Sequence, residues 1–127
     1  MGARMTSQYW KLPVNWNEIT DSVRWAAGGS FSLELNAPST VIAEPMEQRG
    51  AKKLLVHLVN YNVARTPSVS NIGVTFRLPH GAAVSKVTLL SPDRAEAPTL
   101  SHKVQDGAVT FTVPRLAAYD LAVIQLE

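Results

Sequence analysis

The sequence predicts an all-β protein: an antiparallel β-sandwich of about eight strands, preceded by one short N-terminal helix. Three observations predict it. Apolar residues recur with the 3.6-residue period of a helix only before Gly28 and Gly29. After these glycines they alternate with period two or form short apolar runs, and proline, glycine or Asp-Gly signals separate the runs. No helical pattern alternates with the strands, which argues against a parallel α/β fold.

Residues 1–29 are predicted to be an extended arm followed by the helix. An apolar stripe with helical spacing consists of Trp16, Ile19, Val23, Ala26 and Ala27. This stripe predicts a helix over 16–27, with Trp16 facing the core. Asn15 with Glu18 three residues later is a variant of the capping box. Gly28 suits the end of the helix because glycine adopts a left-handed conformation at little cost.

Residues 30–127 are predicted to form the β-sandwich. The expected strands are 31–36, one beginning at 41, 53–61, 72–78, 84–90, 98–104, 109–113 and 119–126. The segment 53–61 is apolar on both faces, which is typical of a central strand. Pro45 marks the second strand as an edge or bulged strand, and Pro114 is expected to end its strand. The Asp-Gly pair at 106–107 predicts a two-residue hairpin turn.

Length and composition exclude several classes of protein. The 127 residues suffice for one domain but not for a catalytic (β/α)₈ barrel, which needs roughly 250 residues. The absence of cysteine excludes disulfides, thiolate zinc sites and cysteine nucleophiles. The net charge of +2 is small and the basic residues do not cluster on a scale that favours nucleic-acid binding.

The sequence also predicts a soluble chain. No stretch approaches the ~18 consecutive apolar residues of a membrane span, and the N-terminus lacks the apolar run of a signal peptide. These observations leave the compartment open. They also leave open whether residues 1–5 are a cloning remnant.

No catalytic or metal-binding residues are predicted. A glycosidase needs two carboxyl groups about 5–5.5 Å or ~6.5–9.5 Å apart. Glu44 and Glu47 are the closest pair in sequence, but their odd spacing places them on opposite faces of a regular strand. The histidines lack metal-clamp spacing; we interpret His57 as a hydrogen-bonded core residue and His80 as a solvated turn residue. No cofactor is expected. Whether the sandwich binds a structural calcium ion stays open, because oxygen-ligand sites leave little trace in one sequence.

The aromatic residues are unevenly distributed. All three tryptophans, Trp10, Trp16 and Trp25, lie in the first 25 residues. Trp25 follows Trp16 by nine positions, about half a turn around the helix, so we expect it to face away from the core. Such an exposed aromatic indicates either an interface with a neighbouring domain or a platform for a sugar ring. We favour the interface, because flexible arms rarely hold the geometry of a platform.

Three segments resemble a known family. Val56–Tyr61, Val87–Asp93 and Val109–Asp120 occur in an order that resembles the small C-terminal all-β domain of large bacterial glycoside-hydrolase-like proteins of the β-galactosidase type. The resemblance covers about residues 16–127 and includes no catalytic signature. It implies a module that follows a catalytic barrel and a middle domain, and that either braces the barrel or binds carbohydrate.

Two positions in these segments also have structural interpretations. Asn60, at the end of a strand, can bond the backbone of a neighbouring turn. Tyr119 can tie a loop with its hydroxyl group, in the manner of a tyrosine corner.

The sequence therefore predicts a non-catalytic β-sandwich accessory domain whose partner is a carbohydrate or the neighbouring catalytic domain. If it binds carbohydrate, Trp10, Trp25 and Tyr61 would stack on sugar rings, with Asn60 and Asn62 as polar partners. The Asn-Tyr-Asn cluster opens the longest predicted loop, where sandwiches often carry function. Two alternatives are a small hydrolase in its own right and an oligomerisation module that uses the apolar face of the helix.

Overall fold

The computed structural model describes residues 13–127 and confirms the predicted fold class, an all-β sandwich with one short helix. The chain divides into two compact units, with the boundary between Phe31 and Ser32. Residues 13–127 contain, in chain order, α1 (Trp16–Ala26), β1 (Leu33–Asn36), β2 (Val41–Gln48), a 3₁₀ turn (Arg49–Ala51), β3 (Lys53–Asn60), β4 (Val69–Arg77), β5 (Val84–Leu90), β6 (Thr99–Leu100), β7 (His102–Gln105), β8 (Ala108–Leu116) and β9 (Tyr119–Leu126).

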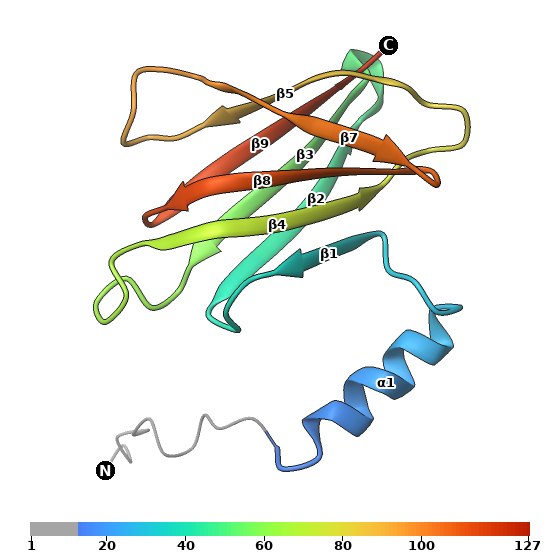
Figure 1. The fold of residues 1–127 in the computed structure, drawn as a ribbon, viewed down its shortest axis with the longest axis vertical. Helices are drawn as coiled ribbons and strands as arrows, with labels where there is room; N and C mark the ends of the chain where they lie inside the picture. Colours follow the sequence, from blue (N-terminus) through green and yellow to red (C-terminus); the bar gives the residue numbers. More distant parts are fainter. Residues whose placement is uncertain (1–12) are drawn as a thin grey trace. The chain divides into compact units, whose positions relative to one another are not determined.

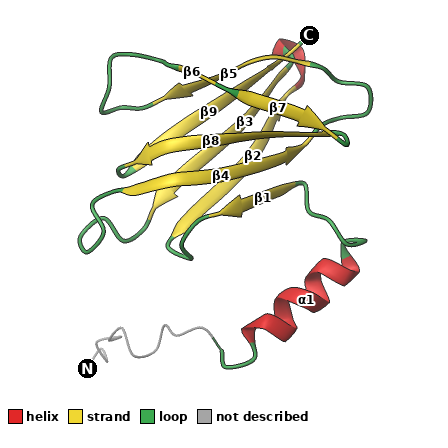
Figure 2. Ribbon diagram, viewed as in Figure 1, coloured by secondary structure: helices red, strands yellow, loops and turns green. Residues whose placement is uncertain are grey.

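The sandwich consists of two antiparallel sheets packed face to face (Figure 1, Figure 2). One has the strand order β1-β4-β8-β7 and the other β2-β3-β9-β5-β6. Every second residue of the long strands points inward, and these inner faces interdigitate to form the core. Its fully buried members include Leu58, Ile72, Leu89, Leu116 and Ile124. The alternation seen in the sequence is therefore the alternation between core and outer face.

Several strand predictions are confirmed. The segments 84–90 and 119–126 coincide with β5 and β9. β3 is a central strand between β2 and β9, and β2, which contains Pro45, lies at the edge of its sheet. The hairpin turn between β7 and β8 has positive φ at both Asp106 and Gly107, +53° and +72°. These are the signs that a type I′ turn requires, and they explain the Asp-Gly pair.

The predicted strand 98–104 is wrong as a single element. The structure divides it at Ser101 into β6, which pairs with β5, and β7, which pairs with β8 in the other sheet. The chain crosses between the sheets at this point. Hydrophobic periodicity does not reveal which sheet a short strand joins, so the pattern merged two strands into one.

The expectation that Pro114 ends its strand is also wrong, because β8 continues through it to Leu116. β7 pairs with β8 only as far as Phe111, so Pro114 lies where that side of β8 is open. Its counterpart in the β4 register, Asn71, adopts a positive φ of +57° and forms no ladder pair. Proline is tolerated at such an edge or irregular position because no ladder hydrogen bond depends on its missing N–H.

The helix begins at Trp16, as predicted, and ends at Ala26, one residue before the predicted end. α1 ends in a Schellman motif, in which Gly28 N–H donates to Trp25 O and Gly29 N–H donates to Arg24 O. Asn15 precedes the helix but makes no side-chain capping bond, so the predicted capping box does not form. The expectation that Trp16 is a core residue is not met either: its exposed fraction is 44%, and no residue of α1 is buried.

Candidate functional site

One end of the sandwich collects the turns and loops that follow β1, β3, β5 and β8, toward the left in Figure 1. Two backbone hydrogen bonds tie these connections together. Asn60 N–H donates to Ala118 O, and Tyr61 N–H donates to Thr40 O, both at 2.9 Å. The predicted residues Asn60, Tyr61 and Asn62 lie at this end, which we call the loop end.

Asn60 organises the loop between β3 and β4. Its side chain points inward and is 3% exposed. Nδ2 donates to Thr66 O at 2.8 Å, and Oδ1 accepts Asn62 N–H at 3.1 Å. The predicted bond from Asn60 to a neighbouring turn backbone is confirmed. Both polar atoms of the amide are already hydrogen bonded to the loop backbone, so Asn60 has few hydrogen-bonding positions left for a ligand.

The other predicted binding residues differ in exposure. Tyr61 is 72% exposed, whereas Asn62 is partly buried and places Nδ2 3.5 Å from Thr66 Oγ1. Trp25 is 84% exposed and belongs to the helical unit. Trp10 lies outside the described residues. The structure thus brings Asn60, Tyr61 and Asn62 together at the loop end.

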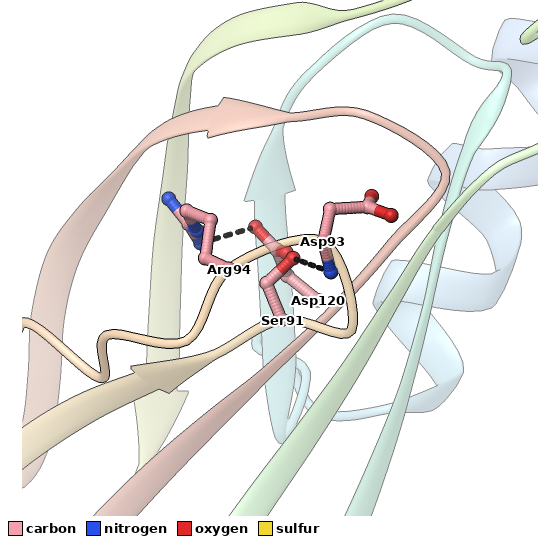
Figure 3. A network of polar contacts seen from close by, with 4 residues as sticks. All are labelled: Ser91, Asp93, Arg94 and Asp120. Atoms are coloured by element: carbon pink, nitrogen blue, oxygen red, sulfur yellow. Dashed lines mark hydrogen bonds and ion pairs between the residues drawn. The ribbon is translucent and has the colours of Figure 1, made fainter.

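A buried carboxylate at the loop end was missed by the sequence reasoning. Asp120 points inward from β9 and is 2% exposed (Figure 3). Arg94 Nη2 donates to Asp120 Oδ2 at 3.3 Å, and the Ser91 hydroxyl also bonds to this carboxylate. Ser91 Oγ in turn accepts the backbone N–H of Asp93 at 3.4 Å. These contacts attach the segment that follows β5 to the start of β9.

Burial raises the pKa of Asp120 above its ordinary value, because a charged carboxylate is poorly solvated there. The Ser91 hydrogen bond and the positive charge of Arg94 lower this pKa, and the negative charge of Asp93 raises it, but burial dominates. The sequence did carry one signal. Asp120 falls on the inward-facing register of its strand with Ala122 and Ile124, where an acidic residue is unusual.

The network opens to solvent as a pocket of about 290 Å³. It is lined by Ser91, Asp93, Arg94, Arg115, Ala117 and Asp120. These residues come from the end of β8, the turn before β9, β9 itself and the segment after β5. We call this cavity the Asp120 pocket.

The two sheets have outer faces of different chemistry. On the four-stranded sheet, the central strands β4 and β8 place Thr75, Thr110 and Thr112 outward. On the five-stranded sheet, the central strands β3 and β9 place four half-buried aliphatic side chains outward, Leu55, Val59, Leu121 and Val123, with His57 and Tyr119 between them and Lys53 and Gln125 at one end. Edge strand β2 adds Ile42 and Met46, each 50% exposed. We call this second surface the apolar outer face.

A histidine lies within the apolar outer face. Nδ1 of His57 is hydrogen bonded to the Tyr119 hydroxyl at 2.7 Å, and Nε2 is buried with no partner among the described residues. His57 is hydrogen bonded, as predicted, but the prediction that it is a core residue is wrong, because it points to the outer face of its sheet. The tyrosine-corner expectation for Tyr119 is wrong, because its hydroxyl reaches a neighbouring strand of the same sheet instead of a loop.

Within residues 13–127, the structure offers no assembled metal site. No group of three or more His, Cys, Asp or Glu side chains there could hold a metal ion. The carboxylate of Glu47 forms an exposed ion pair with Arg49 at 3.2 Å. In the same part of the chain, no helix has the length and apolar character to cross a membrane.

The fold is similar to small parts of two larger enzymes. Alpha-L-fucosidase isoenzyme 2 from Paenibacillus thiaminolyticus matches 86% of this chain with a TM-score of 0.70 and 20% identity. A cycloisomaltooligosaccharide glucanotransferase from Paenibacillus sp. matches 72% of it with a TM-score of 0.57 and 18% identity. This chain spans only 17% and 16% of those two proteins. At these identities the likeness shows the fold alone.

No family model and no curated protein sequence matches the chain. The solved structures therefore carry the comparison. They show that the fold of this sandwich recurs as a small part of two larger enzymes.

Proposed function

We propose that this chain is a non-catalytic accessory domain of a larger glycoside-hydrolase-like protein, and that it packs against a neighbouring domain through its apolar outer face. The proposal rests on the different side-chain chemistry of the two outer faces. Threonines on the four-stranded sheet suit contact with water, whereas the leucines and valines of the five-stranded sheet suit contact with protein. The match to only 17% and 16% of two larger enzymes supports the same context.

The size of the apolar outer face fits this role. Three adjacent strands, each about 4.8 Å wide, and six residues at about 3.3 Å each cover roughly 15 by 20 Å. This footprint of about 300 Å² lies at the lower end of the range of about 300–600 Å² for the largest apolar patch on a typical monomer, which is often functional. It would form the centre of an interface whose polar margin adds further area.

The margin of this face is positively charged at one end. Lys53 and Lys86 line a shallow pocket of about 230 Å³ together with Leu90, Val123 and Gln125. A partner surface with an apolar centre and acidic residues at this margin would complement it.

Hydrophobic interaction chromatography tests the exposed character of the face. Leu121→Lys should shorten retention of the folded chain more than Thr110→Lys, which adds the same charge to the outer face of the other sheet. The matched charge makes the comparison specific for the apolar outer face. Equal shifts for the two variants would contradict the proposal.

A second candidate function, carbohydrate binding, is favoured by two exposed aromatic side chains. Tyr61 is 72% exposed and Trp25 is 84% exposed. Aromatic faces of this kind can stack on sugar rings, and Asn62 could add a polar contact beside Tyr61. Trp10 and Asn60 remain predicted members of such a site.

Tryptophan emission offers a direct assay for this second candidate. The chain would be titrated with soluble polysaccharides and a saccharide panel that includes L-fucose, D-glucose and isomaltoheptaose, since the similar enzymes are named for fucoside and isomaltooligosaccharide chemistry. Carbohydrate binding predicts a saturable shift that Trp25→Ala or Tyr61→Ala abolishes. Unchanged affinity in both variants would exclude these aromatics as the site.

Two alternatives make different predictions. A hydrolase in its own right would act on chromogenic glycosides and lose activity on substitution of Glu44 or Glu47. An oligomerisation module would sediment as an oligomer at high concentration, whereas an accessory domain needs no self-association. Activity on the glycoside panel would overturn the non-catalytic assignment.

A further inference from the structure

The Asp120 pocket presents polar groups that the fold itself does not use. The side chain of Arg115 lines the pocket and makes no hydrogen bond or ion pair with any described residue. Arg94 makes a single contact to Asp120 through Nη2, which leaves its other N–H groups free for a ligand. The side-chain carboxylate of Asp93 accepts no hydrogen bond within residues 13–127. The pocket therefore offers both donors and acceptors.

The charges of the pocket select against ions. Arg94 and Arg115 bring two positive charges, and Asp93 and Asp120 bring two negative charges, so the formal sum is zero. An anion would approach two carboxylates and a cation would approach two guanidinium groups. A neutral ligand with several hydroxyl groups meets neither penalty, because each hydroxyl both donates and accepts.

The site is also built on a fixed base. Asp120 is almost fully buried at the start of β9, and its bonds to Ser91 and Arg94 fix the segment that forms one wall. Arg115 belongs to β8, so the opposite wall is part of a sheet. With Asp120 and both walls held, only the exposed side chains of Arg115, Arg94 and Asp93 have to be ordered when a ligand binds.

We infer that the Asp120 pocket binds one ring of a neutral saccharide, with Arg115, Arg94 and Asp93 as the groups that contact its hydroxyls. A volume of about 290 Å³ lies at the small end of ligand sites and suits a single ring. This inference deepens the carbohydrate-binding candidate of the proposed function and moves the site from the predicted aromatics to a polar pocket.

A ¹H–¹⁵N NMR titration of the full chain tests the inference. L-fucose, D-glucose and isomaltoheptaose serve as neutral probes, and inorganic phosphate serves as the anionic probe. We expect saturable shifts of the backbone amides of Ser91, Asp93, Arg94 and residues 115–120 with at least one saccharide and none with phosphate. Arg115→Ala should weaken this binding roughly tenfold or more, the effect of losing a charged hydrogen bond. Arg77→Ala, an exposed arginine outside the pocket lining, is the matched control and should leave the affinity unchanged.

Substitution of Asp120 risks unfolding the loop end, so the exposed residues Arg115 and Asp93 provide the decisive variants. Absence of shifts with every saccharide up to about 10 mM would overturn the inference. Shifts with phosphate alone, or an affinity unaffected by Arg115→Ala and Asp93→Asn, would also overturn it. Binding that depends on Tyr61 or Trp25 without shifts at the pocket would refute this site while leaving carbohydrate binding itself in place.

Discussion

Replacing Asn60 with alanine should destabilise the sandwich strongly while leaving its surface unchanged. The side chain is 3% exposed and makes two short hydrogen bonds, to Thr66 O at 2.8 Å and from Asn62 N–H at 3.1 Å. Asn60→Ala removes the side-chain donor to Thr66 O and the side-chain acceptor of the Asn62 N–H. Each hydrogen bond contributes about 0.5–1.5 kcal/mol net, and a group left buried without a partner costs about 1–3 kcal/mol.

We therefore expect Asn60→Ala to lower the free energy of unfolding by about 2–3 kcal/mol. Since a domain of this size has a total stability of about 5–15 kcal/mol, the loss should be large in any unfolding experiment. At roughly 4–8 °C per kcal/mol for a domain of 60–100 residues, Tm should fall by about 10 °C or more. Urea unfolding followed by circular dichroism gives the free energy, and a thermal scan gives Tm.

Two further variants separate the contributions. Asn60→Asp keeps the acceptor for Asn62 N–H but loses the donor to Thr66 O. It also places a charge in a buried position, so we expect a comparable loss at neutral pH and a smaller one in acid. Asn62→Ala removes only a 3.5 Å side-chain contact and should cost less than about 0.5 kcal/mol. An Asn60→Ala protein as stable as the wild type would refute this account of the loop.

Three other substitutions probe the core, a turn and the buried acid. Leu58→Ala, at a fully buried core position, should cost about 2–5 kcal/mol in urea unfolding, and a loss below 1 kcal/mol would be inconsistent with the packing. Gly107→Ala should cost about 1–2 kcal/mol because φ is +72°; no atom lies within 4 Å of the new methyl group, so the cost comes from the backbone conformation alone. Gly50→Ala, at a position that is equally open but has no positive φ, should be nearly neutral. The raised pKa of Asp120 means that the folded chain holds this proton more tightly than the unfolded chain. The unfolding free energy of the wild type relative to Asp120→Asn should therefore rise as pH falls from about 7 toward 4, and a constant difference would show that the acid titrates normally.

The parts of the fold that follow from local patterns were predictable. β5 and β9 have the predicted bounds because apolar alternation and flanking turn residues define them without help from distant contacts. The same holds for the turn at Asp106 and Gly107, where two residues with positive φ are needed.

Errors arose where pairing between strands decides the outcome. The continuation of β8 through Pro114 depends on β7 ending earlier, and the division at Ser101 depends on which sheet each side joins. Neither fact is encoded in a window of a few residues. The missing capping bond at Asn15 shows that a residue of suitable type does not by itself establish a cap.

The candidate sites show the same division. The role of Asn60 in its loop was predictable because Asn62 and Thr66 lie close by in sequence. The Asp120 pocket was not, since Arg94 lies 26 residues from Asp120 and only the pairing of β5 with β9 brings them together. A carboxylate on an inward-facing register was the one local sign of this site.

The free energy of unfolding of Leu121→Lys tests the central claim most directly. If the apolar outer face exists for a neighbouring domain, it contributes little to the stability of this chain alone. The variant should then lose no more than about 1 kcal/mol in urea unfolding, far less than the inner-face variant Leu58→Ala. A loss as large as that of Leu58→Ala would show that this face supports the fold itself, and it would contradict the proposed docking surface.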